Sequence, residues 1–315
     1  YKKILIKLMY KYFDTFYDWW KNIDKSIFFI ITTFFTLGLF FSLVSTSIIA
    51  SDKLDTNSYY FFIKHLVFVT VGIFIILLFS FLNQDFVVRI SVFLFFFAFL
   101  ALILVPIIGI EVKGSKRWLE LGALPRFQPI ETLKPFFVII VSLIISLEKK
   151  NLYLKYLLST IILFPTIILL LSQPDLGQTL LIISVWLAII FVSGINLILF
   201  TFSLILLSSL TFYLIFLIPK FEYIKNRIFS FLDPTSGNNY QSERASEAIS
   251  NGGFFGQGIG EGTLNSKVPE AHTDYIISVI SEEFGVLIVL VIMIIFLILS
   301  YNILKKINHE TDDKV

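Results

Sequence analysis

Three residues that could carry acid–base chemistry lie together in the segment 269–275, just before the last long apolar run. Glu270, His272 and Asp274 alternate along this segment. A carboxylate where a loop meets a helix could act as a general base, because the helix dipole and neighbouring charges tune how readily it accepts a proton. Asp274 could equally be the N-terminal cap of the helix that follows. The sequence therefore offers Asp274 as a candidate base and leaves the capping role open.

Metal binding by the same segment is a further alternative. A single histidine makes zinc a poor match, whereas Mg²⁺ or Mn²⁺ needs only one or two carboxylates plus a phosphate. The chain has no cysteine, which excludes disulfides, thiolate metal sites and cysteine nucleophiles. A divalent cation at Asp274 stays open, and no other metal site is predicted.

Cationic side chains gather in the segment 109–129, which holds Lys113, Lys116, Arg117 and Arg126. Ammonium and guanidinium groups bind phosphate oxygens well, so an anionic ligand such as a diphosphate would explain them. Contact with lipid headgroups is the ordinary alternative. The segment alone does not decide between the two.

Two ionisable residues open the next apolar run. Glu131 and Lys134 are three residues apart and therefore share a helix face. Pro129 suits a first helical turn, and Pro135 is expected to kink the helix because it removes an amide donor. Charged groups left unpaired in lipid are costly, so the two residues predict either a functional lining or a structural ion pair.

Three further carboxylates stand at or within apolar runs. Asp175 is most simply the N-cap of the run that follows it. Glu282 and Glu283 lie inside the last run and point in different directions on a helix. Both need partners at membrane depth, so we expect neighbouring helices to supply basic or polar groups to this structural pair.

Apolar runs are the elements that must position these residues. Of 315 residues, 57% are hydrophobic and 15% charged, and the mean hydropathy is +0.86, which excludes an ordinary soluble domain. The net charge of +2 gives no sign of nucleic acid binding. A spanning helix needs about 20 apolar residues. Within lipid, the backbone N–H and C=O groups of a continuous apolar segment find hydrogen-bond partners only if the segment is a helix. Eight runs qualify: 27–50, 59–83, 86–108, 130–147, 156–172, 177–194, 197–218 and 275–303. We predict an all-α, polytopic membrane protein with eight transmembrane helices.

Charge sets the predicted orientation and domain organisation. Six lysines in residues 1–26 place this N-terminal, interfacial segment in the cytoplasm. Residues 27–303 form the transmembrane domain, and 304–315 a polar cytoplasmic end. Alternation then places the segments 51–58, 109–129, 173–176 and 219–274 outside. The last is long, and its aromatic residues predict partial order. The glycines between Gly252 and Gly262 predict a tight, turn-rich loop, since no strand precedes them and no Gly-Lys-Ser/Thr follows.

Seven stretches together resemble the SEDS family (shape, elongation, division and sporulation), polytopic proteins that polymerise peptidoglycan from lipid II. They follow the family's order along most of the chain. They are Lys113-Gly114-Ser115-Lys116-Arg117-Trp118; Phe127-Gln128-Pro129 with Glu131 and Lys134; Gln173-Pro174-Asp175-Leu176-Gly177; Asn239-Tyr240-Gln241; Gly252-Gly253 to Gly262; Pro269-Glu270-Ala271-His272-Thr273-Asp274; and Glu282-Glu283-Phe284-Gly285. Trp19-Trp20, Arg244-Ala245-Ser246-Glu247-Ala248 and Gly260-Glu261-Gly262-Thr263 resemble the cell-division (FtsW) type more than the elongation (RodA) type.

The resemblance implies a glycosyltransferase. The 4-hydroxyl of lipid II would attack the anomeric carbon of a glycan carried on undecaprenyl diphosphate, forming a β-1,4 bond with inversion as the lipid diphosphate leaves. Asp274 would be the general base, and Lys113, Lys116 and Arg117 would bind the diphosphate. Glu131 and Lys134 would line the cavity beneath Asp274, with Asp175 and His272 also binding substrate.

The same resemblance implies partners and a location. The expected partners are a class B penicillin-binding transpeptidase and other divisome membrane proteins, in a bacterial inner membrane at the division septum. A lipid II flippase and a non-catalytic division scaffold are the alternatives; polar clusters at the outer ends of the spans favour surface chemistry over transport. The family normally has ten spans, so a chain with eight is expected to be a fragment or a truncated product.

Overall fold

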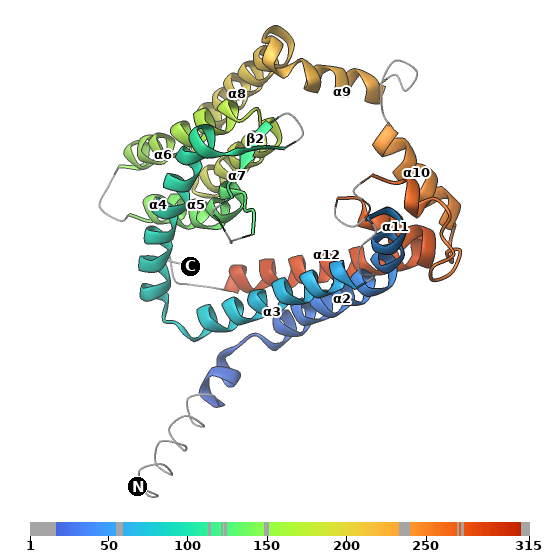
Figure 1. The fold of residues 1–315 in the computed structure, drawn as a ribbon. Helices are drawn as coiled ribbons and strands as arrows, with labels where there is room; N and C mark the ends of the chain where they lie inside the picture. Colours follow the sequence, from blue (N-terminus) through green and yellow to red (C-terminus); the bar gives the residue numbers. More distant parts are fainter. Residues whose placement is uncertain are drawn as a thin grey trace, which may run out of the picture. The chain divides into compact units, whose positions relative to one another are not determined.

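The computed structural model is built almost entirely from helices (Figure 1). It describes residues 17–54, 59–112, 115–120, 122, 125–147, 151–232, 240–269, 271 and 274–309. These residues form two compact units. The first contains the described residues before 83 and after 237, and the second contains those from 83 to 237. Each unit is described by itself.

Six helices of the described chain are long and apolar enough to cross a membrane. They are α2 (Lys25–Leu54), α3 (Tyr60–Phe81), α4 (Gln84–Ile108), α6 (Leu152–Ser172), α8 (Leu197–Leu217) and α12 (Val286–His309). α7 (Leu176–Val192) is also apolar but has 17 residues, as does α5 (Pro129–Ile145). The protein is therefore a polytopic α-helical membrane protein as predicted, although six helices of the described residues reach spanning length where eight were expected.

The prediction of one continuous helix over 275–303 is wrong. The chain forms α11 (Ile276–Phe284) and then α12, with Gly285 between them at φ 86° and ψ 164°. This backbone conformation is open essentially to glycine alone. The amide of Val286 then donates to the carbonyl oxygen of Gly253 at 2.9 Å. α12 thus begins against the glycine-rich loop and does not continue the axis of α11.

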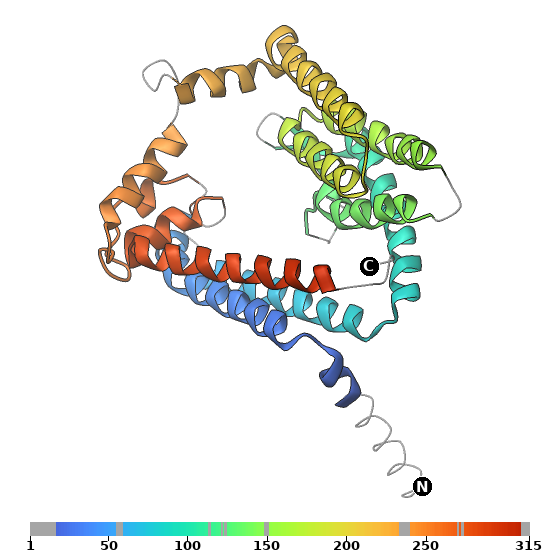
Figure 2. The same cartoon turned by 180° about the vertical axis from the view of Figure 1, so that it is seen from behind.

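In the first unit, α2 packs against both α3 and α12, and the three helices run side by side in both views (Figures 1 and 2). Polar contacts join the start of α2 to the end of α12. Asn302 donates to the Ser26 hydroxyl at 2.9 Å, and Lys306 lies 3.4 Å from Asp24. Asp24 also accepts from the Ile27 amide at 3.1 Å. The amide first, and then the Lys306 charge, hold the pKa of Asp24 below its usual value.

The rest of the first unit surrounds α11. α10 (Tyr240–Gly252) and the short 3₁₀ helix η2 (Asn265–Lys267) pack on it. Ala248 and Val279 belong to the small apolar core that joins these elements. α10 confirms the predicted partial order of the long loop, and positive φ values at four glycines between residues 253 and 260 confirm its turn-rich character.

The second unit contains α4 to α8, and its main core lies where α4, α5, α6 and α7 meet. That core includes Phe95, Leu102, Leu133, Phe137, Leu170 and Ile182. α5 begins at Pro129, as predicted for a first-turn proline, and continues as a helix through Pro135. A two-stranded antiparallel sheet precedes it and was not predicted. It consists of β1 (Ile110–Val112) and β2 (Ser115–Trp118), with Glu111 opposite Lys116.

Candidate functional site

The predicted site residues fall in both units. Asp274, Glu282 and Glu283 belong to the first unit, and Lys116, Arg117, Glu131, Lys134 and Asp175 belong to the second. Lys113 and His272 lie outside the described residues, as does Glu270. The described residues of each unit form a polar cluster of different character.

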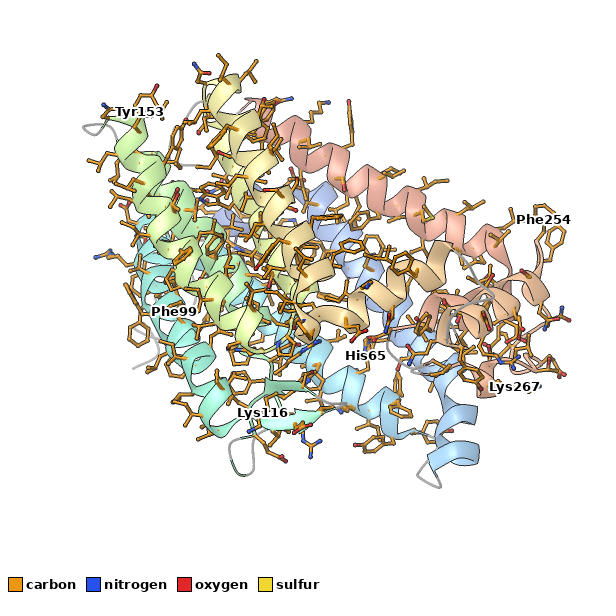
Figure 3. The ribbon with its side chains drawn as sticks, turned by 90° about the horizontal axis from the view of Figure 1, so that it is seen from above. His65, Phe99, Lys116, Tyr153, Phe254 and Lys267 are labelled. Atoms are coloured by element: carbon orange, nitrogen blue, oxygen red, sulfur yellow. The ribbon has the colours of Figure 1, made fainter. Side chains whose placement is uncertain are left out.

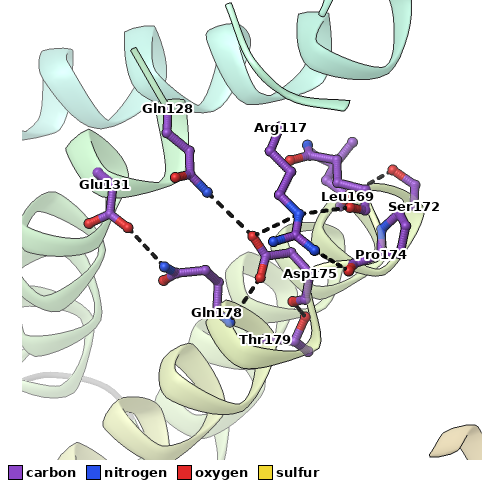
Figure 4. Close-up of polar contacts among 10 residues, drawn as sticks. Arg117, Gln128, Glu131, Leu169, Ser172, Pro174, Asp175, Gln178 and Thr179 are labelled. Atoms are coloured by element: carbon purple, nitrogen blue, oxygen red, sulfur yellow. Dashed lines mark hydrogen bonds and ion pairs between the residues drawn. The ribbon is translucent and has the colours of Figure 1, made fainter. Parts of the chain in front are cut away.

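Asp175 is the centre of the cluster in the second unit (Figure 4). It is the N-cap of α7, accepting from the Gln178 amide at 3.4 Å, so its predicted capping role is confirmed. Its other carboxylate oxygen lies 3.5 Å from Arg117 Nε and accepts from Gln128 Nε2 at 3.3 Å. Asp175 is only 6% exposed. A buried carboxylate with three partners does more than cap a helix, because it joins α7 to β2 and to the start of α5.

Arg117 fixes the hairpin to the turn between α6 and α7. Its Nη2 donates to the carbonyl oxygen of Pro174 at 2.7 Å, and its Nε approaches the carbonyl oxygen of Gln173 at 3.4 Å. Carbonyl groups at a helix C-terminus carry partial negative charge, so a guanidinium is well placed there. The side chain is still 30% exposed. Arg117 therefore has a structural role, and its predicted binding of a diphosphate stays a prediction.

Glu131 and Lys134 form the ion pair that their spacing predicted, with 2.6 Å between Nζ and the carboxylate. Gln178 Nε2 also donates to Glu131 at 2.8 Å, and the main-chain amide of the same residue donates to Asp175, so Gln178 connects this pair to Asp175 (Figure 4). Lys134 is 25% exposed and Glu131 49%. The pair thus ends the polar network at an accessible edge of the unit.

Sequence reasoning did not assign roles to Gln128 and Gln178, which complete this network. Both lie in or directly beside stretches that carry the family resemblance. The Gln128 carboxamide donates to Asp175, whereas Gln178 donates to Glu131 with its carboxamide and to Asp175 with its main-chain amide. Lys116, in contrast, projects from β2 as an exposed side chain with no ion pair among the described residues (Figure 3).

Asp274 occupies the turn immediately before α11 and is exposed. The N-cap position of α11 is Tyr275, and no side chain caps the helix there, so the alternative capping role of Asp274 is wrong. Within the described part of the chain, no hydrogen bond or ion pair engages its carboxylate. Asp274 therefore presents a carboxylate to solvent or ligand from the end of a well-packed helix.

Glu282 and Glu283 lie on α11 and are buried, with 0% and 3% of their surface exposed. Glu282 Oε1 accepts from Asn251 Nδ2 at 2.8 Å and from the Leu264 amide at 2.9 Å. Glu283 Oε1 accepts from Asn265 Nδ2 at 3.0 Å. The expectation that polar groups surround this pair is confirmed, and the hydrogen-bond donors named here are neutral amides.

The backbone of the glycine-rich loop also docks on the end of α11. The amides of Gln257 and Gly258 donate to the carbonyl oxygens of Glu282 and Glu283 at 2.8 and 3.1 Å. A Cβ on Gly256 would lie 2.2 Å from the carbonyl oxygen of Glu283, so only glycine permits this approach. These contacts hold α11, and with it the turn that carries Asp274.

No group of three His, Cys, Asp or Glu side chains that could hold a metal ion occurs in the ranges that the structure describes. Two of the three residues in the predicted cluster at Asp274 lie outside those ranges. A divalent cation at Asp274 therefore stays a prediction.

Residues 24–315 match the family described as cell cycle protein, which groups FtsW, RodA and SpoVE. Similar curated proteins include the probable peptidoglycan glycosyltransferase FtsW of Caulobacter vibrioides, 30% identical over 85% of this chain and 68% of the relative. The protein of the same name from Coxiella burnetii is 34% identical over 85% of this chain and 73% of its own length.

Solved structures share the fold. One chain belongs to a structure described as structural coordination of polymerization and crosslinking by a peptidoglycan synthase complex. It covers 88% of this chain and 76% of its own length, with a TM-score of 0.66 and 24% identity. The Thermus thermophilus rod shape determining protein RodA covers 89% of this chain and 73% of its own, with a TM-score of 0.57 and 22% identity.

Proposed function

The chain belongs to the FtsW/RodA/SpoVE family of cell cycle proteins, and we propose that it is a peptidoglycan glycosyltransferase of the cell-division type. It would polymerise lipid II into β-1,4-linked glycan strands and release undecaprenyl diphosphate. The observation that carries this proposal is the match of most of the chain to curated relatives of at least 30% identity that bear this name. The exposed carboxylate of Asp274 supplies a group that this chemistry needs.

In this proposal Asp274 is the general base. The 4-hydroxyl of the acceptor sugar attacks the anomeric carbon of the donor, and its proton passes to the Asp274 carboxylate. The bond between the anomeric carbon and the diphosphate oxygen breaks, and its electron pair leaves with the lipid diphosphate. Attack from the opposite face inverts the anomeric centre. An exposed carboxylate that no other described residue engages suits this role, since hydrogen bonds to it would compete with the hydroxyl.

The negative charge that develops on the departing diphosphate requires cations. We assign this role to Lys113, Lys116 and Arg117, of which Lys116 is exposed and Arg117 is partly exposed. Asp175 is buried, so it would act on the substrate through the orientation that it gives Arg117. The accessible Glu131–Lys134 pair and His272 are proposed to contact the sugar or the diphosphate.

The setting follows from the same family. We propose a bacterial inner membrane at the division septum, and a class B penicillin-binding transpeptidase and other divisome proteins as partners. A related fold in a complex that polymerises and crosslinks peptidoglycan supports the transpeptidase.

The test compares the full chain, Asp274→Asn and the control Glu261→Gln, each with the transpeptidase, on labelled lipid II. Glu261 is an exposed carboxylate in the preceding loop. We expect a glycan ladder from the parent and the control, and none from Asp274→Asn when that variant is folded and partner-bound. Equal ladders from all three would remove Asp274 from catalysis. Lipid II binding without any ladder would favour a flippase or a scaffold.

A further inference from the structure

Two adjacent phenylalanine side chains of the glycine-rich loop, Phe254 and Phe255, are exposed and are called the aromatic pair below. Phe254 is 69% exposed and Phe255 85%, and Figure 3 shows Phe254 projecting outward from the loop. Removing apolar surface from water is favourable, so a patch of large apolar side chains left this open indicates a surface that another apolar phase covers.

The backbone of the loop fixes the position of the aromatic pair. The Gly256 amide donates to the carbonyl oxygen of Gly252 at 2.8 Å, which closes a tight turn around the pair. The Leu287 amide, in the first turn of α12, donates to the carbonyl oxygen of Phe254 at 3.4 Å, next to the hydrogen bond already described for Val286. The aromatic pair is therefore held beside the start of α12.

The start of α12 marks one boundary of the membrane core. α12 is predominantly apolar from Val286 to Leu304, and Lys305 and Lys306 follow near its other end. At 1.5 Å per residue, this apolar part is about 28 Å long, close to the roughly 30 Å of a bilayer's hydrocarbon core. Lysines near a helix end reach the headgroup level on their side of the membrane. Val286 therefore lies at the opposite boundary of the core, and the aromatic pair lies beside it.

The surroundings of the aromatic pair favour lipid over a protein partner. Residues 248–260 contain no charged residue, whereas Glu247 and Glu261 stand directly on either side of this stretch. Charged groups are costly in a bilayer, while protein interfaces carry a polar rim. Leu287, whose amide bonds to Phe254, is also exposed, as is Leu290 one turn later. Apolar surface is thus exposed both on the loop and on the membrane-crossing helix to which the loop is bonded.

We propose that Phe254 and Phe255 insert into the interfacial region of the bilayer and anchor the glycine-rich loop to the membrane surface. Aromatic and large apolar side chains are favoured at this depth. The same loop holds the end of α11, so the anchor would fix the height above the membrane of the turn that carries Asp274. The proposal concerns what surrounds the loop and does not depend on the proposed glycosyltransferase reaction.

The test uses spin labels, because the chain has no cysteine and a single introduced cysteine reports on one position. Phe255→Cys is compared with Leu290→Cys on α12 and with Glu261→Cys in the same loop. Each full chain carries the same nitroxide in lipid nanodiscs. Power saturation in EPR measures collisions with oxygen, which concentrates in lipid, and with a water-soluble nickel chelate. We expect the oxygen-to-nickel ratio at position 255 to be several-fold higher than at 261 and nearer to the value at 290.

A second variant, Phe254→Cys, repeats the measurement with the other ring in place. Both side chains are exposed, so neither substitution should change the Tm of the chain. Ratios at 254 and 255 equal to the ratio at 261 would place the loop in water and overturn the proposal. Low collision rates with both reagents would show that protein covers the aromatic pair, and would overturn it as well.

Discussion

Replacing Asp175 tests whether the polar cluster of the second unit holds that unit together. Its carboxylate caps α7, pairs with Arg117 and accepts from Gln128. Asp175→Ala removes all three contacts at once, whereas Asp175→Asn keeps an oxygen for the cap and loses the charge. We therefore expect the alanine variant to be the less stable of the two.

The magnitude follows from the contacts. Loss of an N-cap lowers the free energy of unfolding by about 1 kcal/mol. Gln128 is only half-buried, so leaving its donor without an acceptor adds no more than about 1–2 kcal/mol. Arg117 keeps its two carbonyl contacts and is 30% exposed, so its loss of a partner adds little. Asp175→Ala should therefore cost about 2–3 kcal/mol, and Asp175→Asn about half as much, because asparagine is a good cap.

Thermal unfolding of both variants in nanodiscs measures the effect, with Glu120→Gln as the control. Glu120 pairs with Arg126 at 3.3 Å, but both side chains are exposed, so its loss should cost less than about 1 kcal/mol. For a unit of this size, 1 kcal/mol corresponds to roughly 2–4 °C in Tm. If Asp175→Ala unfolds at the same temperature as Glu120→Gln, the cluster does not stabilise the unit. If Asp175→Asn is as unstable as Asp175→Ala, the charge outweighs the cap.

Two further predictions concern the first unit. Gly285→Ala should cost more than the roughly 1–2 kcal/mol expected for Gly194→Ala: both glycines have positive φ, but a Cβ at 285 would lie 2.2 Å from the Phe254 carbonyl oxygen, and one at 194 meets nothing within 4 Å. Equal Tm values for the two variants would show that the Phe254 carbonyl oxygen does not exclude a side chain at position 285. Asp24→Ala should lose up to about 1 kcal/mol of capping stability at neutral pH. Because folding lowers the pKa of Asp24, this contribution is complete above its ordinary value of 3.8 and disappears as the pH falls below it. A gap between Asp24→Ala and the parent that persists in acid would contradict this reasoning.

The features that sequence reasoning identified correctly depend on neighbours in the chain. Asp175 caps α7 three residues before its partner Gln178, and Glu131 pairs with Lys134 one turn later. The long apolar runs form helices because, within lipid, only a helix gives the backbone N–H and C=O groups of such a run their hydrogen-bond partners. Such local rules need no knowledge of what packs against the segment.

The features that were missed depend on segments far apart in the chain. The break at Gly285 exists because the loop near Gly253 supplies hydrogen-bond acceptors to the start of α12. A hydropathy profile does not detect the break, since the two residues directly beside it, Phe284 and Val286, are apolar. Arg117 reaches the carbonyl oxygens before Asp175 from a strand more than fifty residues away. The sequence identifies these residues as polar candidates, but only the fold determines which of them form hydrogen bonds or ion pairs with one another.

The number of protein partners that a polar side chain has indicates whether its role is structural or chemical. Asp175 and Arg117 have much of their hydrogen-bonding capacity occupied by protein groups, so substitutions there should change stability as well as activity. Asp274 and Lys116 are exposed and engage no partner among the described residues, so their loss should leave the fold intact. A charged side chain kept at the surface of a membrane protein without a protein partner gains nothing for stability from its position. Activity lost without a change in Tm in Asp274→Asn would therefore identify this residue as part of the chemistry and not of the scaffold.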